Sequence, residues 1–373
     1  MTYQSFQPPR RILMGPGPSD VYPEVLLAQS RPAIGHLDPL FVAMMDELKA
    51  LLQYAFQTDN AMTLALSAPG SAGMEACFVN LVEPGEKVIV CVNGVFGGRM
   101  LENIKRIGAK PVVVNTTWGR AVDVEAVKAA IAAHPDARFL AFVHAETSTG
   151  ALSDAQALCA VAKNAGLLTI VDAVTSLGGV PVKVDEWGID AIYSGSQKCL
   201  SCVPGLSPVS FSPDAVDKLQ NRKTPVQSWF LDQSLVMGYW QGDGKRSYHH
   251  TAPVNTLYAL HEALLHLYHE GLEASWQRHQ QMHQLLAAGL AELGLEFIVP
   301  EGERLPQLNT VTLPAGVDDA AVRRQLLEQY NLEIGAGLGD LAGKAWRIGL
   351  MGFGARRENV ALCLAALKDV LGK

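Results

Sequence analysis

The chain has 373 residues, a length that fits about two domains rather than one simple core. Hydrophobic residues make up 49% and charged residues 18%, so we expect a globular protein with a well-buried interior. The net charge of −7 gives no electrostatic reason to expect a nucleic acid or an anionic membrane as a partner. No apolar run reaches the roughly 18 residues that a membrane helix needs.

The two ends of the chain carry no targeting pattern. The first residues, MTYQSFQPPRR, lack the apolar segment of a secretory signal. The last residues, VLGK, differ from the Ser-Lys-Leu peroxisomal address. We therefore expect a cytoplasmic protein.

The first 250 residues alternate between strand-like and helical patterns. Residues 1–20 are rich in proline and glycine and predict an extended arm, and a helical pattern follows at 39–56. From about residue 62, helical segments such as 124–134 and 155–166 separate short apolar runs. These runs are residues 87–93, 111–115, 139–144, 168–173, 191–196 and 208–212. The alternation predicts an α/β fold with a buried, mainly parallel sheet.

The pattern changes after about residue 250. Two long helical stretches, 255–272 and 275–293, lead to four strand-like runs and a final helix at 358–372. This part predicts a smaller α+β domain. We therefore expect an N-terminal arm (1–20), a large domain (21–250) and a small C-terminal domain (251–373).

An acid and a lysine follow two neighbouring predicted strands. Asp172 ends the run LLTIVD, and Lys198 closely follows AIYSGS, 26 positions later. Two parallel strands joined by a helix would bring both groups to the same edge of one sheet. Pyridoxal phosphate (PLP) needs such a pair, because a lysine amine forms its Schiff base and a carboxylate keeps its pyridine nitrogen protonated.

A turn of small residues opens a predicted helix. Residues 68–73 read Ala-Pro-Gly-Ser-Ala-Gly and precede MEACFVNLV. Small residues let backbone N–H groups approach an anion, so a phosphate fits this helix N-terminus, although an ordinary turn fits it equally well. The segment is neither a Walker loop, because no Gly-Lys-Ser/Thr follows, nor a GxGxxG motif.

Two further segments offer groups that could bind a carboxylate. Residues 144–150, HAETSTG, place hydroxyls at the end of a predicted strand, where they could bind a ligand or cap the next helix. Arg347 stands inside the apolar run AWRIGLMG. A buried arginine needs a partner, which is either a substrate carboxylate or a structural ion pair.

Cysteine and histidine pairs give weak metal or redox signals. Cys199 and Cys202 form a lone CxxC without a second pair, for which packing near the site is the simpler interpretation. Residues 249–250 are a double histidine without acidic or cysteine partners at ligand spacing. His279 and His283 lie four apart on a predicted helix whose amphipathic sequence predicts a solvated face. We therefore expect no metal site.

Taken together, the motifs resemble those of the class V PLP-dependent aminotransferases, in particular the alanine–glyoxylate / serine–pyruvate aminotransferase family. The resemblance covers nearly the whole chain, and the spacing of VDAVTSLGG and SGSQK is its most specific part. The matching segments are residues 15–20, 34–39, 144–150, 171–179, 194–200, 248–254 and 346–352. It implies the fold of the PLP-dependent aspartate-aminotransferase-like enzymes.

The resemblance also implies roles for individual residues. Lys198 matches the Schiff-base lysine and Asp172 the carboxylate on the pyridine nitrogen. Further cofactor contacts are implied for Gly70, Ser71, Ala72, Phe96, Thr147, Val174 and Gln197. Substrate contacts are implied for Arg347, Thr147 and His36. Relatives often have tryptophan or tyrosine in place of Phe96, and some have histidine in place of Ser71.

The resemblance implies a homodimer with composite sites. Tyr248 and Thr251 match residues that reach the phosphate in the neighbouring subunit. They follow a polar stretch, QGDGKRS (241–247), which predicts an exposed loop. Each active site is then expected to contain residues of both chains.

The implied activity is transfer of an amino group from alanine or serine to glyoxylate or pyruvate. The alternative within the family is a ureidoglycine–glyoxylate aminotransferase of purine catabolism, but the segment IGHLDP around His36 favours the alanine/serine group. A cysteine desulfurase or β-eliminating lyase would need a catalytic cysteine, and neither Cys199 nor Cys202 fits clearly. A nicotinamide dehydrogenase is disfavoured because GxGxxG is absent. A non-catalytic binding protein requires that Lys198 form no bond to the cofactor.

Overall fold

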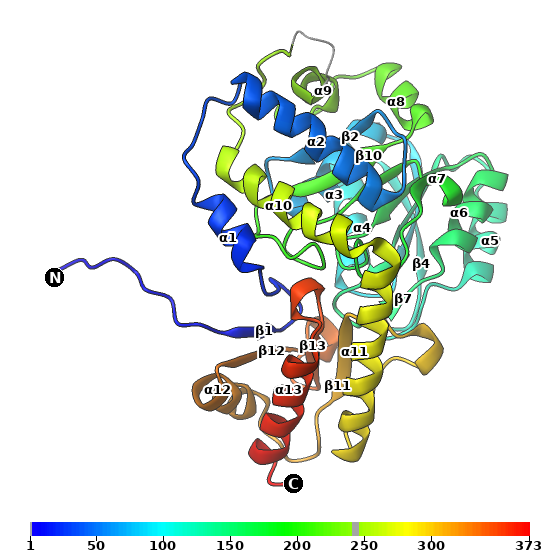
Figure 1. Cartoon of the computed structure of the whole chain (residues 1–373). Coiled ribbons are helices and arrows are strands. Elements are labelled where there is room, and N and C mark those ends of the chain that lie inside the picture. Colours follow the sequence, from blue (N-terminus) through cyan, green and yellow to red (C-terminus); the bar gives the residue numbers. More distant parts are fainter. Residues whose placement is uncertain (1, 241–245) are drawn as a thin grey trace.

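Two β-sheets of unequal size organise the molecule (Figure 1). The computed structural model describes residues 2–240 and 246–373. Most of the predicted loop at 241–247 therefore lies outside the described residues. Among the described helices, none combines the length and the apolar character that a membrane span requires.

The larger sheet has seven strands in the order β2-β10-β9-β8-β5-β3-β4. Strand β10 runs antiparallel to both of its neighbours, and all other neighbouring pairs are parallel. The strands are β2 (Met62–Leu66), β3 (Lys87–Val92), β4 (Lys110–Asn115), β5 (Phe139–Val143), β8 (Leu168–Asp172), β9 (Ala191–Tyr193) and β10 (Ser207–Phe211). The predicted α/β fold with a mainly parallel sheet is confirmed.

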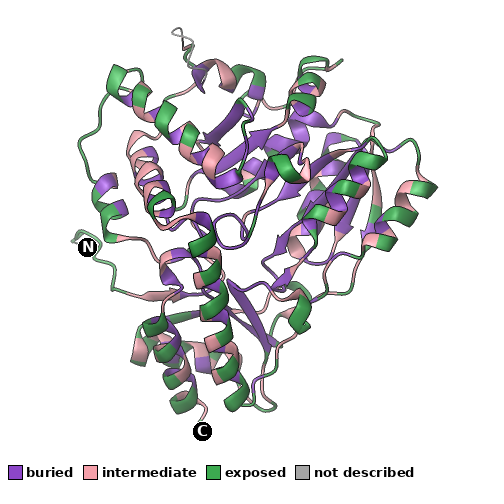
Figure 2. Ribbon diagram, turned by 45° about the vertical axis from the view of Figure 1, so that its right-hand side comes forward, coloured by how far each residue is buried: buried purple, intermediate pink, exposed green. Residues whose placement is uncertain are grey.

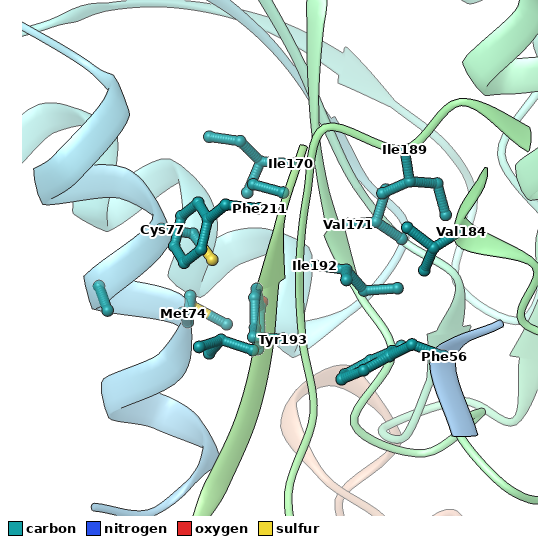
Figure 3. Close-up of a cluster of buried hydrophobic side chains, with 14 of the residues drawn as sticks. Phe56, Met74, Cys77, Ile170, Val171, Val184, Ile189, Ile192, Tyr193 and Phe211 are labelled. Atoms are coloured by element: carbon teal, nitrogen blue, oxygen red, sulfur yellow. The ribbon is translucent and has the colours of Figure 1, made fainter. Parts of the chain in front are cut away.

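Helices cover both faces of this sheet because its strands are apolar on both sides. Figure 3 shows Ile170 and Tyr193 turned toward Met74 of helix α3, while Val171 and Ile192 face the opposite layer. The helices of this part are α1 (Pro23–Gln29), α2 (Pro39–Phe56), α3 (Gly70–Leu81), α4 (Val95–Ile107), α5 (Val124–Ala133), α6 (Ala155–Asn164), α7 (Val184–Trp187), α8 (Pro213–Gln220), α9 (Gln233–Trp240) and α10 (Val254–Glu270). Burial is concentrated in the sheet, whereas the outer helix faces are exposed (Figure 2).

The smaller sheet has four strands in the order β1-β12-β13-β11. These strands are β1 (Ile12–Met14), β11 (Leu308–Thr312), β12 (Leu332–Ala336) and β13 (Ala345–Gly349). Helices α11 (Leu272–Glu292), α12 (Asp319–Tyr330) and α13 (Arg357–Val370) accompany it. A two-stranded hairpin, β6 (Ala145–Glu146) with β7 (Ala151–Leu152), follows β5 of the larger sheet.

The packing divides the chain differently from the expected boundaries. Strand β1, inside the expected arm 1–20, pairs in parallel with β12 and so belongs to the smaller sheet. Helix α10, beyond the expected boundary at 250, buries Leu257, Leu260 and Leu264 in the core of the larger sheet. Helix α11 contributes Leu272 to that core and Leu286 to the smaller one. The two cores therefore meet within α11.

The expectation of a solvated face for His279 and His283 is wrong. Both side chains are buried, and His283 Nδ1 lies 2.6 Å from Asn309 Oδ1. His279 lies between the Ser275 carbonyl and the Gly352 N–H, at 2.7 and 2.9 Å. These contacts join α11 to β11 and to the loop after β13, so the histidines satisfy buried polar groups that amphipathic spacing alone does not reveal.

Candidate active site

Asp172 and Tyr193 end two adjacent parallel strands and meet at the edge of the larger sheet. Asp172 is the last residue of β8 and lies opposite Tyr193, the last residue of β9. The Tyr193 hydroxyl donates to Oδ2 of Asp172 at 2.7 Å, and the Val174 N–H donates to Oδ1 at 2.8 Å. Burial raises the pKa of the Asp172 carboxyl to about 7, although these two hydrogen bonds act in the opposite direction.

Lys198 lies in the loop that follows β9 and is largely buried. Its ammonium donates to the carbonyl of Pro16, and the Ser19 hydroxyl donates to the Lys198 carbonyl at 2.7 Å. The segment between β1 and α1 therefore covers the lysine. Burial lowers the pKa of the Lys198 amine to about 8, because a charged amine loses its hydration there.

These groups line one pocket of about 200 Å³. Seven residues assigned to the cofactor by the family resemblance line it: Gly70, Ser71, Phe96, Asp172, Val174, Gln197 and Lys198. Ala72 does not line the pocket; it lies in the first turn of α3, and its N–H donates to the Pro69 carbonyl at 2.8 Å. The structure thus brings together both groups of the Asp172–Lys198 pair and the turn at 68–73.

The pocket has the features that an anion on a flat ring requires. The N-terminus of α3 opens at Gly70 and Ser71, where backbone N–H groups and the helix dipole favour negative charge. A Cβ at Gly70 would lie 3.3 Å from both the Ser194 carbonyl oxygen and Cγ2 of Val174, so a larger residue at this position would press against these two neighbours. Within the described chain, Oε1 of Gln197 is buried without a hydrogen-bond partner, so this amide is available to a ligand.

Arg347, in the middle of β13, is buried without an ion pair to any described carboxylate. Its Nε donates to the Ala336 carbonyl at 2.8 Å, and Nη1 donates to the Thr147 carbonyl at 3.1 Å. Burial lowers the pKa of its guanidinium. Of the two partners that the sequence leaves open, the structural ion pair is therefore not found, and the guanidinium retains donors for a carboxylate ligand.

Four further residues with implied roles do not line the pocket: Thr147, His36, Tyr248 and Thr251. The buried Thr147 hydroxyl is hydrogen-bonded to that of Thr175. Tyr248 is 61% exposed, and its hydroxyl lies 3.3 Å from that of Thr251, but neither residue lines the pocket. The His36 ring lies 5.3 Å from the Tyr248 ring, and His36 does not line the pocket of its own chain.

Three pocket residues were not predicted from the sequence: Met74, Arg99 and Tyr193. Tyr193 could have been found, because it ends the strand that neighbours Asp172 in a parallel pair. Arg99 follows Phe96 by one helical turn, and its guanidinium carbon lies 4.7 Å from the centre of the Phe96 ring. That spacing of three residues on one helix face was the available signal.

Comparison with known proteins agrees with this geometry. The family model "Aminotransferase class-V" matches residues 22–343. The alanine–glyoxylate aminotransferase of Oryctolagus cuniculus is 42% identical over 365 residues, covering 97% of this chain and 93% of that protein. The (S)-ureidoglycine–glyoxylate transaminase of Bacillus subtilis is 36% identical over 381 residues, covering 97% and 91%.

A solved structure gives the same result for the fold. The crystal structure of an alanine–glyoxylate aminotransferase from Nostoc sp. superposes with a TM-score of 0.97 at 47% identity, covering 100% of this chain and 98% of that chain. Both the extent of the family match and the identity over nearly the full length exceed what a shared fold alone would give. The chain therefore belongs to the class V aminotransferase family and is an aminotransferase.

Proposed function

We propose that this aminotransferase uses PLP and moves the amino group of a small amino acid, alanine or serine, to glyoxylate or pyruvate. The observation that carries the proposal is the pocket itself: a buried amine and a buried carboxylate line it together with a helix N-terminus. Relatives at 42% and 47% identity are named for alanine and glyoxylate, which supports this substrate pair.

Bound at this site, PLP would supply an aldehyde that reacts with amines and a ring that accepts electrons from the substrate α-carbon. Lys198 would hold the cofactor through its amine and, once displaced by the substrate, would carry a proton to and from the α-carbon. Its lowered pKa suits both tasks, because an uncharged amine is needed for each. Asp172 would face the pyridine nitrogen and hold a proton there.

Arg347 would orient the substrate by gripping its carboxylate. Its two backbone acceptors, Ala336 and Thr147, fix the guanidinium in place, while burial removes competing water. A planar two-bond grip specifies a carboxylate, which amino acids and 2-oxo acids share. The same arginine can therefore serve the donor and the acceptor in turn.

The second candidate is the ureidoglycine–glyoxylate activity, which the relative from Bacillus subtilis carries in its name at 36% identity. Both candidates share glyoxylate and differ in the amino donor. Side-chain selectivity depends on pocket shape, so the donor distinguishes them.

We also propose a homodimer in which Tyr248 and Thr251 serve the neighbour's cofactor. Both residues are exposed, and neither lines the pocket of its own chain, which supports this arrangement. Large apolar side chains are exposed in the same region, among them Trp229 and Phe230, and the Phe230 ring lies 5.3 Å from that of His250. Such a patch is typical of an interface. A cytoplasmic location stays a prediction.

A donor screen under single-turnover conditions tests the proposed function. Purified protein is loaded with PLP, each amino acid is added alone, and the visible absorption of the bound cofactor is followed. Alanine or serine should change the spectrum fastest, and glyoxylate or pyruvate should restore it. A response to ureidoglycine alone would favour the second candidate, and no response to any amino acid would reject both.

A further inference from the structure

One buried acid beside the pocket has no part in the chemistry described above. Glu146 is fully buried, and no described cation forms a salt bridge with it. It stands in the short strand β6, beyond the carboxyl end of β5. Burial raises the pKa of its carboxyl against the opposing effect of several hydrogen bonds.

Those hydrogen bonds come from the first turn of helix α4. Oε2 of Glu146 accepts from the N–H of Phe96 at 3.2 Å and of Gly97 at 3.3 Å. The Ser148 hydroxyl donates to Oε1 at 2.6 Å and itself accepts from the Val95 N–H at 3.0 Å. The N-cap residue, Gly94, has no side chain to do this, so the segment 146–148 caps α4 from elsewhere in the chain.

The close approach of the two segments depends on Gly94. A Cβ at this position would lie 2.4 Å from Cδ of Glu146 and 2.5 Å from the Ser148 hydroxyl. The glycine therefore leaves the space that the carboxylate fills. Glu146, its hydrogen-bonded partner Ser148 and the glycine form one unit at the N-terminus of α4.

This unit determines the position of Phe96, the aromatic residue that lines one side of the pocket. Phe96 is the second residue of α4, and its ring lines the pocket that contains Lys198 and Asp172. The carboxylate binds the backbone of Phe96 itself, so it fixes the point from which the ring projects. The neighbouring Thr147 carbonyl accepts from Arg347, so the same short segment contacts both the cofactor wall and the arginine.

We propose that Glu146 is a positioning residue that holds Phe96 against the ring of the bound cofactor. The inference rests on the proposed function, because it assigns Phe96 a cofactor to cover. Glu146 acts through the first turn of α4 and touches neither substrate nor reacting atoms.

Glu146→Gln is the sharpest substitution, because it keeps the shape of the side chain. Both carboxylate oxygens face donors, so an amide must turn its NH₂ group toward one of them in either orientation. Either the first turn of α4 or the N–H of Ser148, whose hydroxyl itself accepts from the Val95 N–H, then loses an acceptor in a buried place. Phe96→Leu, alone and combined with Glu146→Gln, completes a double-mutant cycle.

The measured quantities are the dissociation constant for PLP and the visible circular dichroism of the bound cofactor. With Phe96 present, Glu146→Gln should weaken PLP binding by roughly tenfold and change the dichroism. In the Phe96→Leu background, the same substitution should change affinity by less than about twofold, because the ring it positions is gone. Ser148→Ala, which removes one donor to the carboxylate but retains the acid, should give a smaller change in the same direction.

Asp154→Asn is the matched control, since Asp154 caps α6 by accepting from Ala157 N–H at 2.9 Å, outside the pocket lining. It should lower the melting temperature without changing PLP affinity or dichroism. Equal losses of affinity with Phe96 present and in the Phe96→Leu background, or unchanged binding and dichroism in both Glu146→Gln and Ser148→Ala, would overturn the positioning role while leaving the proposed function intact. A wild-type chain that binds no PLP would instead reject both.

Discussion

Burial acts in opposite directions on the two ionisable groups of the pocket. It raises the pKa of the Asp172 carboxyl to about 7 and lowers that of the Lys198 amine to about 8, because each loses hydration in its charged form. An aminotransferase that uses PLP needs an uncharged lysine amine near neutral pH, and a carboxylate that is charged when it faces the protonated pyridine ring of the cofactor. Burial brings the pKa values of both groups close to neutral pH.

The first prediction concerns the pH dependence of covalent attachment. The folded pKa of Lys198, about 8, lies below the ordinary 10.5, so the uncharged amine appears as pH rises through 8. The initial rate of PLP attachment to cofactor-free protein, trapped with borohydride, should therefore rise between about pH 7 and 9 and then level off. Nα-acetyl-lysine is the control and should continue to rise toward 10.5. A protein profile that matches this control would contradict the buried-amine assignment.

Asp172→Asn should retain the fold but lower kcat by roughly 10²–10³-fold or more. A neutral amide no longer favours a protonated pyridine nitrogen, although it can still accept from Val174 or Tyr193. Steady-state kinetics and a melting curve measure the two properties separately. Unchanged turnover would remove Asp172 from the site.

Arg347→Lys should raise KM for both the amino acid and the 2-oxo acid and leave PLP affinity nearly unchanged. A lysine ammonium is a point charge and cannot reproduce a planar two-bond grip on a carboxylate. Titrations of substrate and of PLP distinguish the two effects. Loss of PLP with retained substrate binding would make Arg347 a cofactor or structural residue.

At the scale of elements, the close contact of α3 with the larger sheet positions the turn at residues 68–73, which we propose binds the phosphate. Helix α3 begins at Gly70, and one turn later a Cβ at Gly73 would lie 2.0 Å from the Ser207 hydroxyl and 3.1 Å from Cβ of Tyr193. The helix therefore lies against β9 and β10 at a distance that only glycine permits. As a result, the N-terminus of α3 is held beside the loop that contains Lys198.

Gly73→Ala should lower the free energy of unfolding by about 1–3 kcal/mol, because the added methyl group overpacks this contact. Gly98→Ala is the matched control, since it is also helical and a Cβ there meets nothing within 4 Å. The control should stabilise the protein by up to about 1 kcal/mol through helix propensity. Denaturant unfolding measures both, and equal stabilities for the two variants would contradict the close packing of α3.

Local patterns in the sequence were enough to predict six of the seven strands of the larger sheet, and β2 was not among the predicted runs. The apolar runs at 168–173 and 191–196 match β8 and β9, because a buried parallel strand is apolar on both faces. The contacts between distant segments were beyond such reasoning. Strand β1 joins β12 across more than 300 residues, and the Glu146 cap of α4 joins residues 50 apart. Periodicity reports which side of an element is buried and not which element covers it.

The pocket residues likewise divide into those that local sequence patterns predicted and those that they did not. Asp172 and Lys198 could be predicted because two adjacent parallel strands place their carboxyl ends together. Tyr193, at the end of the second of these strands, was missed, since an aromatic at a strand end is more often read as core. The roles of Tyr248 and Thr251 were inferred from the family resemblance alone, because contacts with a second chain leave no periodic pattern in the sequence.

At the scale of the whole molecule, the N-terminal segment links the smaller sheet to the lysine. Strand β1 pairs with β12 in the smaller sheet, and within five residues Ser19 donates to the Lys198 carbonyl. Arg347 stands on the neighbouring strand β13. The lysine and the arginine are thus held relative to each other by a short stretch of chain, which favours a fixed separation between cofactor and substrate carboxylate.

The composite-site proposal predicts complementation between two inactive variants. One chain carries Lys198→Ala and the other carries both Tyr248→Ala and Thr251→Ala. In a mixed two-fold dimer one site collects every defect and the other collects none. Refolding equal amounts together should therefore restore activity to about one quarter of wild type by that symmetry. Activity that stays at the level of the parents would show that each site is built within one chain.

The most direct measurement follows the nitrogen atom itself. The PLP-loaded protein is given alanine labelled with ¹⁵N together with unlabelled glyoxylate, and the products are analysed by mass spectrometry. Glycine carrying ¹⁵N should form in equal amount with pyruvate, and the Lys198→Ala variant should form neither. Absence of labelled glycine, both here and when serine labelled with ¹⁵N replaces alanine, or undiminished transfer by the Lys198→Ala variant, would contradict the proposal that this chain is a PLP-dependent aminotransferase for small amino acids and glyoxylate.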